Sequence, residues 1–391
     1  MGWPSVEYEE LPWHSSSRGM SRRTARNAPL TYKSAVVPRI ADAQVNLDAE
    51  TTTLLETATL AVKEFDLSHA HRIVPFTPLL LRSESFASSQ IEQLTSSARR
   101  ILKAELTELA GTNARLIVAN TRQMQEAASI EGASTSTLLY MHDVLMRDSA
   151  PEIAGVLRQQ PVWIGGHDMY SRDALFVPPY HGHLPALMED LEAFVARRDL
   201  PILVHAALAH AQFETIHPFA DGNGRTGRAL VHVLLRQRGL TGQTSLPLSA
   251  GLLTEIDSYF TALDSYREGR PQEIIDVFIH SAISAVERGT WLAAELNVLR
   301  GEWEGEVSAR GDALVWQLIP FLLRRPVVTS RIVAEELNTT PVSARKALDT
   351  LEGTGILASA MLDKRTRAWR AVEVLDLLDE FAARGGRRQA P

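Results

Sequence analysis

Apolar residues recur at helical spacing along most of this 391-residue chain, and this periodicity limits the fold more than any other feature of the sequence. The pattern begins near Asp48 and is interrupted between Pro161 and Pro179, where two short β-prone runs are separated by polar turn residues. The sequence therefore predicts a mainly α protein with one small β-hairpin before its central part. Helices are expected within 48–66, 83–109, 113–147, 184–197, 201–216, 225–239 and 250–300.

The length of the chain fits two or three domains rather than one. Hydrophobic residues make up 45% and charged residues 22%, so most of the chain has enough apolar side chains to form a core. The chain contains no cysteine, which excludes a disulfide framework, a thiolate metal site and a cysteine nucleophile. This composition fits a reducing compartment.

No apolar run reaches the roughly 18 residues of a membrane-spanning helix. The first residues, MGWPSVEYEELPW, lack the basic flank and apolar stretch of a signal peptide. These features predict a cytoplasmic protein with no membrane partner. The net charge of −7 disfavours nucleic-acid binding by the chain as a whole, but residues 314–391 carry 12 Lys and Arg against 9 Asp and Glu. The C-terminal part is therefore considered separately.

Changes in composition and pattern divide the chain into four parts. Residues 1–45 mix Ser, Arg and Pro with little periodicity and are expected to form a poorly ordered arm, whose Arg-rich patch contacts either solvent or nucleic acid. An N-terminal helical segment is expected over 46–115 and a helical core over 116–300. A separate small domain is expected over 305–391.

The pattern of this last domain is two short helices joined by a tight turn and followed by a β-prone stretch, as in a winged helix-turn-helix. The second helix, VSARKALDTL, follows Pro341 and carries Arg345 and Lys346. Basic residues on the wing would be Lys364, Arg365 and Arg367. The domain either binds DNA through these residues or stabilises a dimer or presents targets.

Residues 217–228, HPFADGNGRTGR, combine a glycine-rich loop with the start of a helix. Gly222 and Gly224 permit unusual backbone conformations and the close approach of a ligand. The free amides and the dipole of a helix N-terminus favour anions. Arg225 and Arg228 lie three residues apart, near one face of the first helical turn, and add charged donors for phosphate oxygens.

Two further residues of this loop suit chemistry on a phosphate. The Asp221 carboxylate is an oxygen ligand suited to a Mg²⁺ ion that is also held by phosphates. The ordinary pKa of a histidine such as His217 suits proton transfer near neutral pH. Together these residues indicate phosphoryl or nucleotidyl transfer. The alternative is a glycine-rich turn that caps a helix, with two surface arginines and an incidental histidine.

The same string resembles the signature of the Fic family of protein adenylyltransferases. That signature is His-x-Phe-x-Asp/Glu-Gly-Asn-Gly-Arg-x-x-Arg. Every fixed position is met: His217, Phe219, Asp221, Gly222, Asn223, Gly224, Arg225 and Arg228. The resemblance covers about residues 45–300 by general pattern, and 217–228 is its specific part.

The resemblance implies that His217 takes a proton from a Ser, Thr or Tyr hydroxyl of a target protein. That hydroxyl oxygen attacks the α-phosphate of ATP, and pyrophosphate leaves. Asp221 would hold Mg²⁺, and Phe219 would anchor the loop in the core. Contacts to ATP are expected from Asp221, Gly222, Asn223, Gly224, Arg225, Thr226, Gly227 and Arg228, with Asn223 and the loop amides on the α- and β-phosphates and Arg228 on the γ-phosphate.

In this family a β-hairpin that precedes the signature pairs with an extended segment of the target. The hairpin predicted between Pro161 and Pro179 is in the corresponding place. An exposed strand edge binds a peptide through backbone hydrogen bonds. The alternative is a purely structural hairpin. The residues expected to form the docking flap are Ile164, Gly165, Gly166, Phe176 and Val177.

An inhibitory helix is a further implication. Many Fic proteins carry Ser/Thr-x-x-x-Glu-Gly/Asn, and Ser88 and Glu92 match it on one face of a predicted helix. Gln93 departs from the Gly or Asn of the family. Glu92 would pair with Arg228 and leave the γ-phosphate without its partner. The alternative is an ordinary solvated glutamate on an amphipathic helix.

Two more residues are assigned to the nucleotide pocket by the resemblance, and two histidines are not. Glu255 stands near a position where the family commonly has asparagine, and Tyr259 is expected to line the adenine pocket. His205 and His210 lie five residues apart, which is poor spacing for a shared metal, so they are expected to be packing or surface residues.

The predicted function is Mg²⁺-dependent transfer of AMP from ATP to a protein, including the protein itself. Two alternatives stay open. One is removal of AMP or transfer of another nucleotide or phosphate-containing group. The other is a DNA-binding regulator whose nucleotide site only senses. Members of the family often form homodimers, which makes a homodimer a further expectation.

Overall fold

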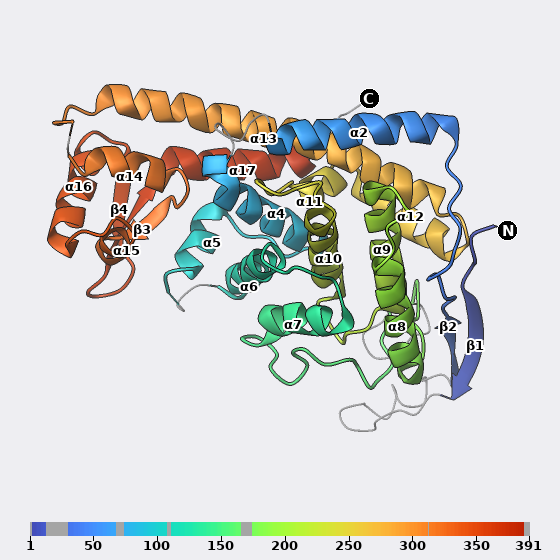
Figure 1. Cartoon of the computed structure of the whole chain (residues 1–391). Helices are drawn as coiled ribbons and strands as arrows, with labels where there is room; N and C mark the ends of the chain where they lie inside the picture. The colour runs from blue at the N-terminus through green and yellow to red at the C-terminus, as the bar shows by residue number, and fades with distance from the viewer. Residues whose placement is uncertain are drawn as a thin grey trace. The chain divides into compact units, whose positions relative to one another are not determined.

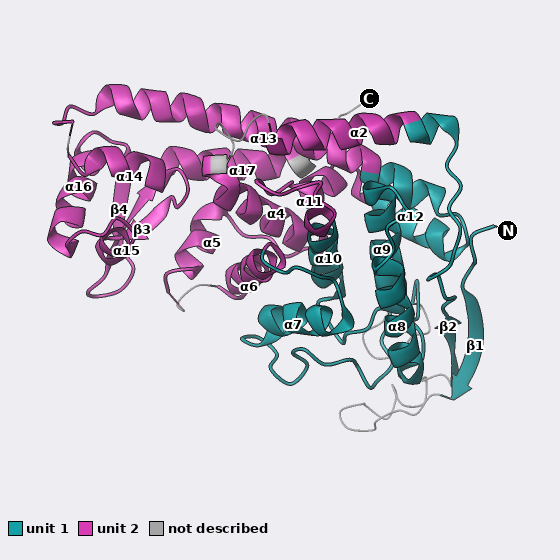
Figure 2. Cartoon of the chain, in the orientation of Figure 1, with its two compact units in different colours: residues 1–52, 129–234, 257–278 teal, residues 53–128, 235–256, 279–391 magenta. Residues whose placement is uncertain are grey.

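The computed structural model describes residues 2–12, 30–67, 74–107, 111–165, 174–311 and 313–386. Most of these residues lie in helices (Figure 1), as the periodicity of the sequence predicts. Among them, no helix combines the length and the apolarity needed to cross a bilayer. The chain divides into two compact units, which Figure 2 distinguishes by colour. Unit 1 consists of residues 1–52, 129–234 and 257–278, and unit 2 consists of residues 53–128, 235–256 and 279–391.

Unit 1 is built around helix α9 (Ile202–Ile216), whose residues from Leu203 to Ile216 are all buried, so that the helix is covered on every side. Helix α8 (Leu184–Val195) packs along it. Many of the buried side chains of α9 are alanines, which allow neighbouring elements to approach closely. The other elements of unit 1 are β1 (Glu7–Pro12), β2 (Thr31–Val36), α7 (Thr135–Met146), the 3-10 turn η3 (His181–His183), most of α10 (Asn223–Gln237) and α12 (Ile256–Arg267).

The N-terminal segment differs from the poorly ordered arm that its composition predicted. Strands β1 and β2 pair antiparallel, with Glu7 opposite Val36 and Pro12 opposite Thr31. The Val6 amide also donates to the carbonyl oxygen of Arg267 at 2.7 Å. Burial alternates over residues 31–34, the first four residues of β2, which is the pattern of a strand with one buried face. Residues 13–29, which contain the Arg-rich patch, lie outside the described residues.

Unit 2 has helix α4 (Thr77–Ile91) in its core, with 12 of its 15 residues buried. Helix α4 packs against α6 (Thr112–Ala127), α11 (Leu248–Leu252) and α17 (Val372–Gly386). Two buried carboxylates of unit 2 accept hydrogen bonds from backbone amides. Asp66 accepts from the amides of residues 242–244, and Glu84 accepts from the amide of Ser249 at 2.8 Å. The remaining helices here are α2 (Ala49–Leu67), η1 (Val74–Phe76), α5 (Ala98–Ala104), η4 (Leu253–Glu255) and most of α13 (Gln272–Glu306).

The C-terminal part of unit 2 contains three helices and a three-stranded sheet. Its elements in chain order are α14 (Val315–Leu322), β3 (Val327–Thr329), α15 (Ser330–Glu336), α16 (Pro341–Gly353), β4 (Leu357–Met361) and β5 (Arg367–Ala371). The strand order is β3-β5-β4, and all pairs are antiparallel. The Thr340 hydroxyl accepts from the Ser343 amide and caps α16, which begins at Pro341.

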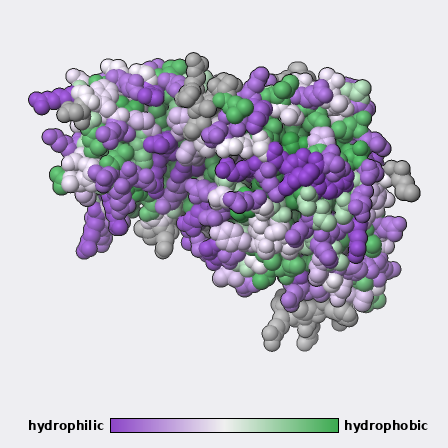
Figure 3. Space-filling view, in the orientation of Figure 1, coloured by the Kyte–Doolittle hydropathy of each residue, from purple (hydrophilic) through white to green (hydrophobic). Residues whose placement is uncertain are grey.

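Helix α17 follows β5 directly and joins this C-terminal part to the rest of unit 2. It packs against α4 and α5 (Figure 1). The Asp379 carboxylate accepts from the Ala98 amide at 2.8 Å, which caps α5, because the Ser97 side chain makes no capping bond. Arg288 of α13 donates to the Arg384 carbonyl oxygen at 2.6 Å. Hydrophilic and hydrophobic side chains are interspersed over the face shown in Figure 3.

Candidate active site

The loop between α9 and α10 holds its histidine in an unusual backbone conformation. His217 terminates α9 with φ 49° and ψ 62°, which is the left-handed region. Its amide still donates to the Phe213 carbonyl oxygen at 2.8 Å. Non-glycine residues adopt this conformation at a cost, and such residues cluster at functional sites. The left-handed turn directs the chain out of α9 and into the loop.

Phe219 and His142 stack against each other and support this loop. Phe219 is fully buried, and its ring lies parallel to the ring of His142 at a centroid distance of 3.8 Å. His142 Nε2 donates to the Asp221 carbonyl oxygen at 3.0 Å, and the Gly155 amide donates to His142 Nδ1 at 3.1 Å. These two bonds define a neutral imidazole with its proton on Nε2. The expectation that Phe219 lies in the core agrees with its complete burial.

Asn223 closes the loop with its side chain. Its Oδ1 accepts from the Phe219 amide and its Nδ2 donates to the Phe219 carbonyl oxygen, both at 2.9 Å. The side chain is therefore occupied with the loop backbone in this structure, although the sequence resemblance assigned it to phosphates. Its backbone amide and that of Gly224 belong to the first turn of α10, where an amide has no acceptor within the helix. The main-chain amides, rather than the Asn223 side chain, are therefore the candidate donors for the predicted anion site.

The side chain of Asp221 differs from its neighbours because it is exposed. It is 67% accessible, while that of Arg225 is 5% accessible, and their closest charged atoms are 3.7 Å apart. Gly222 has φ 75°, and a Cβ there would lie 3.0 Å from Leu145 and 3.3 Å from Met146. Both the backbone angle and the contact with α7 therefore favour glycine at this position.

The other predicted nucleotide contacts on α10 are buried. Thr226 is 0% and Arg228 is 2% accessible. Gly227 faces α9, since a Cβ there would lie 2.8 Å from Glu214 Oε1 and 2.9 Å from Phe213. The structure thus gives Gly227 a role in the close packing of α10 on α9, which the sequence resemblance did not distinguish from nucleotide binding.

Arg158, like His142, contacts this loop and was not selected by the sequence analysis. It is buried, and its Nε donates to the His217 carbonyl oxygen at 2.8 Å. Its Nη2 donates to the Pro179 carbonyl oxygen at 2.7 Å. The backbone amide of Arg158 donates to the Pro218 carbonyl oxygen at 3.0 Å. One guanidinium therefore joins the backbone of the candidate base to the segment that ends the predicted flap. Burial lowers the pKa of Arg158 to about 10, so the group stays charged at neutral pH.

The predicted flap has a single antiparallel bridge among the described residues, between Ile164 and Phe176. Phe176 and Val177 are buried, at 3% and 9% accessibility, and Gly165 is exposed. The Val177 carbonyl oxygen accepts from the Ala35 amide of β2 at 3.0 Å. Strand β2 therefore occupies one side of the 176–177 segment, and Phe176 and Val177 do not present their side chains to a target. Gly166 lies outside the described residues.

The two histidines of α9 are packing residues, as expected. His205 Nε2 bonds to the Phe194 carbonyl oxygen at 2.9 Å, and His210 Nε2 bonds to the Tyr259 hydroxyl at 2.7 Å. Tyr259 is 1% accessible, so this hydroxyl lies in the core of unit 1. The expectation that Tyr259 lines the adenine pocket stays a prediction. Glu255 is exposed at the end of η4, and its predicted role is likewise untested.

The predicted inhibitory residues lie on α4. Ser88 is fully buried, and Glu92 is the exposed residue at the C-cap of the helix. Gln93 has φ 60°, its amide donates to the Gln90 carbonyl oxygen, and the Leu94 amide donates to that of Ser89. These bonds form a Schellman motif, whose left-handed position favours glycine or asparagine. The family preference at position 93 thus has a backbone cause.

Replacement of Gln93 by glycine is expected to raise the free energy of unfolding by about 0.5–1 kcal/mol, because glycine adopts a left-handed conformation without a steric penalty. Urea denaturation of the wild type and the variant measures this difference. Gln93→Ala is the matched control, since it removes the same side chain and keeps the penalty. An alanine variant as stable as the glycine variant would contradict the explanation.

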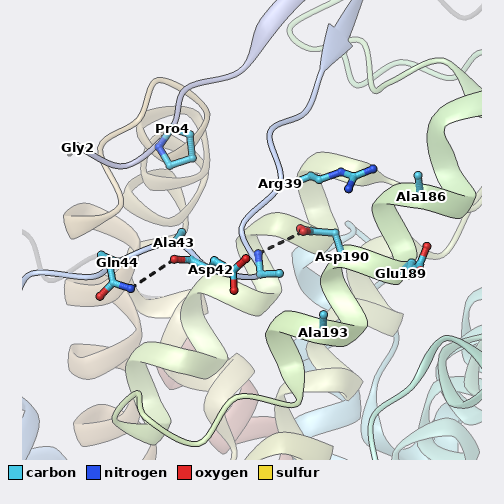
Figure 4. A pocket seen from close by; sticks show the side chains of 11 residues that line it. Gly2, Pro4, Arg39, Asp42, Ala43, Gln44, Ala186, Glu189, Asp190 and Ala193 are labelled. Carbon is cyan, nitrogen blue, oxygen red and sulfur yellow. Dashed lines mark hydrogen bonds between the residues drawn. The ribbon is translucent and has the colours of Figure 1, made fainter.

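The cavity drawn in Figure 4 lies elsewhere in unit 1. Its volume is about 710 Å³, and its lining comes from residues 2–4, the 39–44 segment and helix α8. Asp190 in its wall accepts from the Ile40 amide at 2.7 Å. The lining includes none of the residues 217–228. Among the described residues, no group of three or more His, Cys, Asp or Glu side chains has the arrangement of a metal site.

Comparison with solved structures identifies the class of fold. A Fic family protein from Desulfovibrio desulfuricans G20 superposes with a TM-score of 0.57 at 19% identity, over 84% of this chain and 97% of that chain. Fic-1 from C. elegans superposes with a TM-score of 0.51 at 17% identity, over 62% of this chain and 72% of that chain. The mainly α fold expected from the sequence is therefore a Fic-type fold.

Residues 133–235 match the Fic/DOC family model. The chain is similar to "Protein adenylyltransferase Fic" of Drosophila virilis, at 28% identity over 193 residues, which cover 47% of this chain and 37% of the relative. It is 36% identical over 105 residues to the protein of the same name from Drosophila erecta, covering 26% of this chain and 19% of the relative. The chain thus spans less than two fifths of the length of these relatives, and its similarity to the Fic/DOC family model is confined to residues 133–235.

Proposed function

We propose that this protein transfers AMP from ATP to a Ser, Thr or Tyr hydroxyl of a target protein, and also to itself. The observation that carries the proposal is the complete loop of residues 217–228 at the start of α10. A histidine, an exposed carboxylate and the amides of the first turn of α10 lie within this loop. Similarity to proteins named protein adenylyltransferase Fic supports the same reaction.

In the proposed reaction the target oxygen forms a bond to the α-phosphorus of ATP, and the bond from that phosphorus to the bridging oxygen of pyrophosphate breaks. His217 takes the proton of the attacking hydroxyl. The amides at the start of α10 and the side chains of Arg225 and Arg228 bind the phosphates and offset the charge of the leaving group. In this reaction the protein acts by positioning the reactants and by stabilising charge.

A Mg²⁺ ion is proposed as the cofactor, with Asp221 as its protein ligand. The fit follows from the donor set, because Mg²⁺ in phosphoryl-transfer sites takes one or two carboxylates together with substrate phosphates. The Asp221 side chain is the exposed carboxylate of the loop, at 67% accessibility, and adjoins the proposed phosphate site. When bound, the ion would neutralise phosphate charge.

We further propose that Glu92 pairs with Arg228 and inhibits the transfer, as the Ser88–Glu92 spacing suggests.

The test is incubation of the purified wild type, Glu92→Gly and His217→Ala proteins with Mg²⁺, α-labelled ATP and a cell lysate. We expect label on protein with Glu92→Gly, weak label with the wild type and none with His217→Ala. The loss of a general base alone is expected to slow transfer by about 10²–10⁴-fold. Absence of label in every sample would contradict AMP transfer. Release of AMP from a labelled protein in a parallel assay would then support the alternative, AMP removal.

A second candidate function is DNA binding by residues 327–371. The observation that favours it is the exposed face of α16, where Val342 is 80% accessible and Arg345 and Lys346 are also exposed. Lys364 and Arg365 between β4 and β5 are exposed too. Arg367, the third basic residue expected on the wing, instead forms an ion pair with Asp349 at 3.2 Å. Binding to DNA would make the protein a regulator as well as an enzyme.

Titration of a labelled DNA duplex with the whole protein tests this candidate. We expect binding that weakens as salt increases, and a lower salt dependence after Lys346→Ala, because one phosphate contact is lost. Arg331→Ala of α15, which removes an exposed arginine paired with Glu335, is the control. No binding at low salt would leave dimer formation or target presentation as the role of this domain.

A further inference from the structure

We propose that Glu214 is a positioning residue for His217. Its carboxylate orients the imidazole and balances the positive charge that the ring gains when it takes the proton of the target hydroxyl. This inference rests on the proposed AMP transfer. It adds a residue that lies outside the 217–228 string and one turn earlier, on α9.

The first observation is that two oxygens of Glu214 face the same ring nitrogen. His217 Nδ1 lies 3.3 Å from the Glu214 carbonyl oxygen and 3.8 Å from its Oε2. A proton on Nδ1 is directed toward these acceptors, which leaves the lone pair on Nε2 for the target hydroxyl. The same logic operates in hydrolases, where a buried carboxylate fixes the tautomer of the base and stabilises its charged form.

The second observation is burial. The Glu214 side chain is 8% accessible and that of His217 is 19% accessible. Charges interact more strongly away from water, so a carboxylate 3.8 Å from the ring has a large effect on a proton that arrives there. Glu214 is therefore a poor candidate for a solvated helix residue, which is the usual role of a helical glutamate.

The third observation is that α10 provides the space for this carboxylate. A Cβ at Gly227 would lie 2.8 Å from Glu214 Oε1 and 3.1 Å from His210 Nδ1. Gly227 therefore permits Glu214 to lie under His217 instead of turning away. Arg267 of α12 interacts electrostatically with Glu214. His217 and His210 of α9 and Arg267 of α12 are therefore charged or titratable groups that face Glu214.

The experiment compares Glu214→Gln with Glu189→Gln, a control that removes an exposed carboxylate from α8. Both changes are made in the Glu92→Gly protein and keep the shape of the side chain. The first readout is the NMR titration of the His217 ring, assigned by its absence from the His217→Ala protein. We expect Glu214→Gln to lower the midpoint of this titration by about one pH unit, because the charged ring loses its partner. Glu189→Gln should leave it unchanged.

The second readout is the rate of AMP incorporation. Glu214→Gln should lower kcat by about 10-fold to 100-fold while the KM for ATP changes less than about twofold, because the interaction strengthens only as the ring becomes charged. The low-pH limb of the rate profile should shift to lower pH. Gly227→Ala, which displaces Glu214 from the other side, should move the His217 midpoint in the same direction.

Two results would overturn the inference: a His217 midpoint that stays the same in Glu214→Gln, or a kcat equal to that of Glu189→Gln. Failure of the proposed function is a distinguishable outcome. In that case no protein with an intact Glu214 incorporates AMP, while the NMR titration still reports whether Glu214 acts on His217.

Discussion

Arg158→Met should destabilise the protein by about 3–5 kcal/mol, which is among the largest effects expected for a single polar residue. Methionine fills most of the space but donates no hydrogen bond. The carbonyl oxygens of Pro179 and His217, which Arg158 contacts at 2.7 and 2.8 Å, would then lose a charged donor in a buried environment. Urea denaturation followed by circular dichroism measures the change in the free energy of unfolding.

The matched control is Arg147→Met. The Arg147 side chain is 47% accessible and pairs with Asp143 at 2.9 Å on the surface of α7. Such exposed pairs contribute about 0–1 kcal/mol. An equal loss of stability in the two variants would mean that the contacts of Arg158 with the loop contribute no more to the free energy of unfolding than an exposed ion pair does. If the prediction holds, residual folded Arg158→Met protein should also show weaker AMP incorporation, because the backbone of His217 has lost its support.

The second large effect is a dependence of stability on pH that originates at His142. Burial lowers the pKa of His142 in the folded protein to about 4, from an ordinary value of 6.5. The unfolded chain therefore binds a proton at a higher pH than the folded protein does. The contribution of the neutral His142 ring to the free energy of unfolding is fully present above pH 6.5. This contribution is lost as the pH falls from about 6.5 to about 4. Between pH 7 and pH 5 the expected loss is about 2 kcal/mol.

Comparison of the wild type with His142→Gln isolates this contribution. The glutamine has no titrating group, so its free energy of unfolding should fall less than that of the wild type between pH 7 and pH 5. His183→Gln is the control, because the His183 side chain is 50% accessible and pairs with Glu9 on the surface. Identical pH profiles for the wild type and His142→Gln would show that His142 is not the source. The measurements are made without Mg²⁺ and nucleotide.

The sequence predicted the helical fold and the central loop because both depend on local patterns. Helical periodicity follows from the repeat of the helix itself, and 217–228 is contiguous. Comparison with known structures confirmed the Fic-type fold. The loop is held, however, by residues far away in the sequence. Arg158 lies 59 residues before His217, and His142 lies 79 residues before Asp221.

The periodicity of the sequence selects neither of these two residues. His142 stands on the buried face of an ordinary amphipathic helix, and Arg158 stands in a loop between Leu157 and Gln159. Only the folded chain shows that their donors reach the carbonyl oxygens of the 217–228 loop. The N-terminal strands were missed for a related reason. The Ser- and Arg-rich composition between them outweighed the short alternation at the start of β2, whose partner lies beyond that stretch.

The helix α17 has a consequence for how this chain can be divided. It begins one residue after the C-terminal sheet, yet its buried side chains, Val374, Leu375, Leu378 and Phe381, belong to the unit that contains α4 and α5. A fragment trimmed to the family-matched region, or one that stops before Val372, would uncover this apolar surface and leave the Ala98 amide without Asp379. Anything that stabilises the folded C-terminal domain also stabilises α17, and with it the packing around the helix that carries Glu92. The C-terminal sheet and the helix that carries Glu92 are thus thermodynamically linked, and neither is a detachable module.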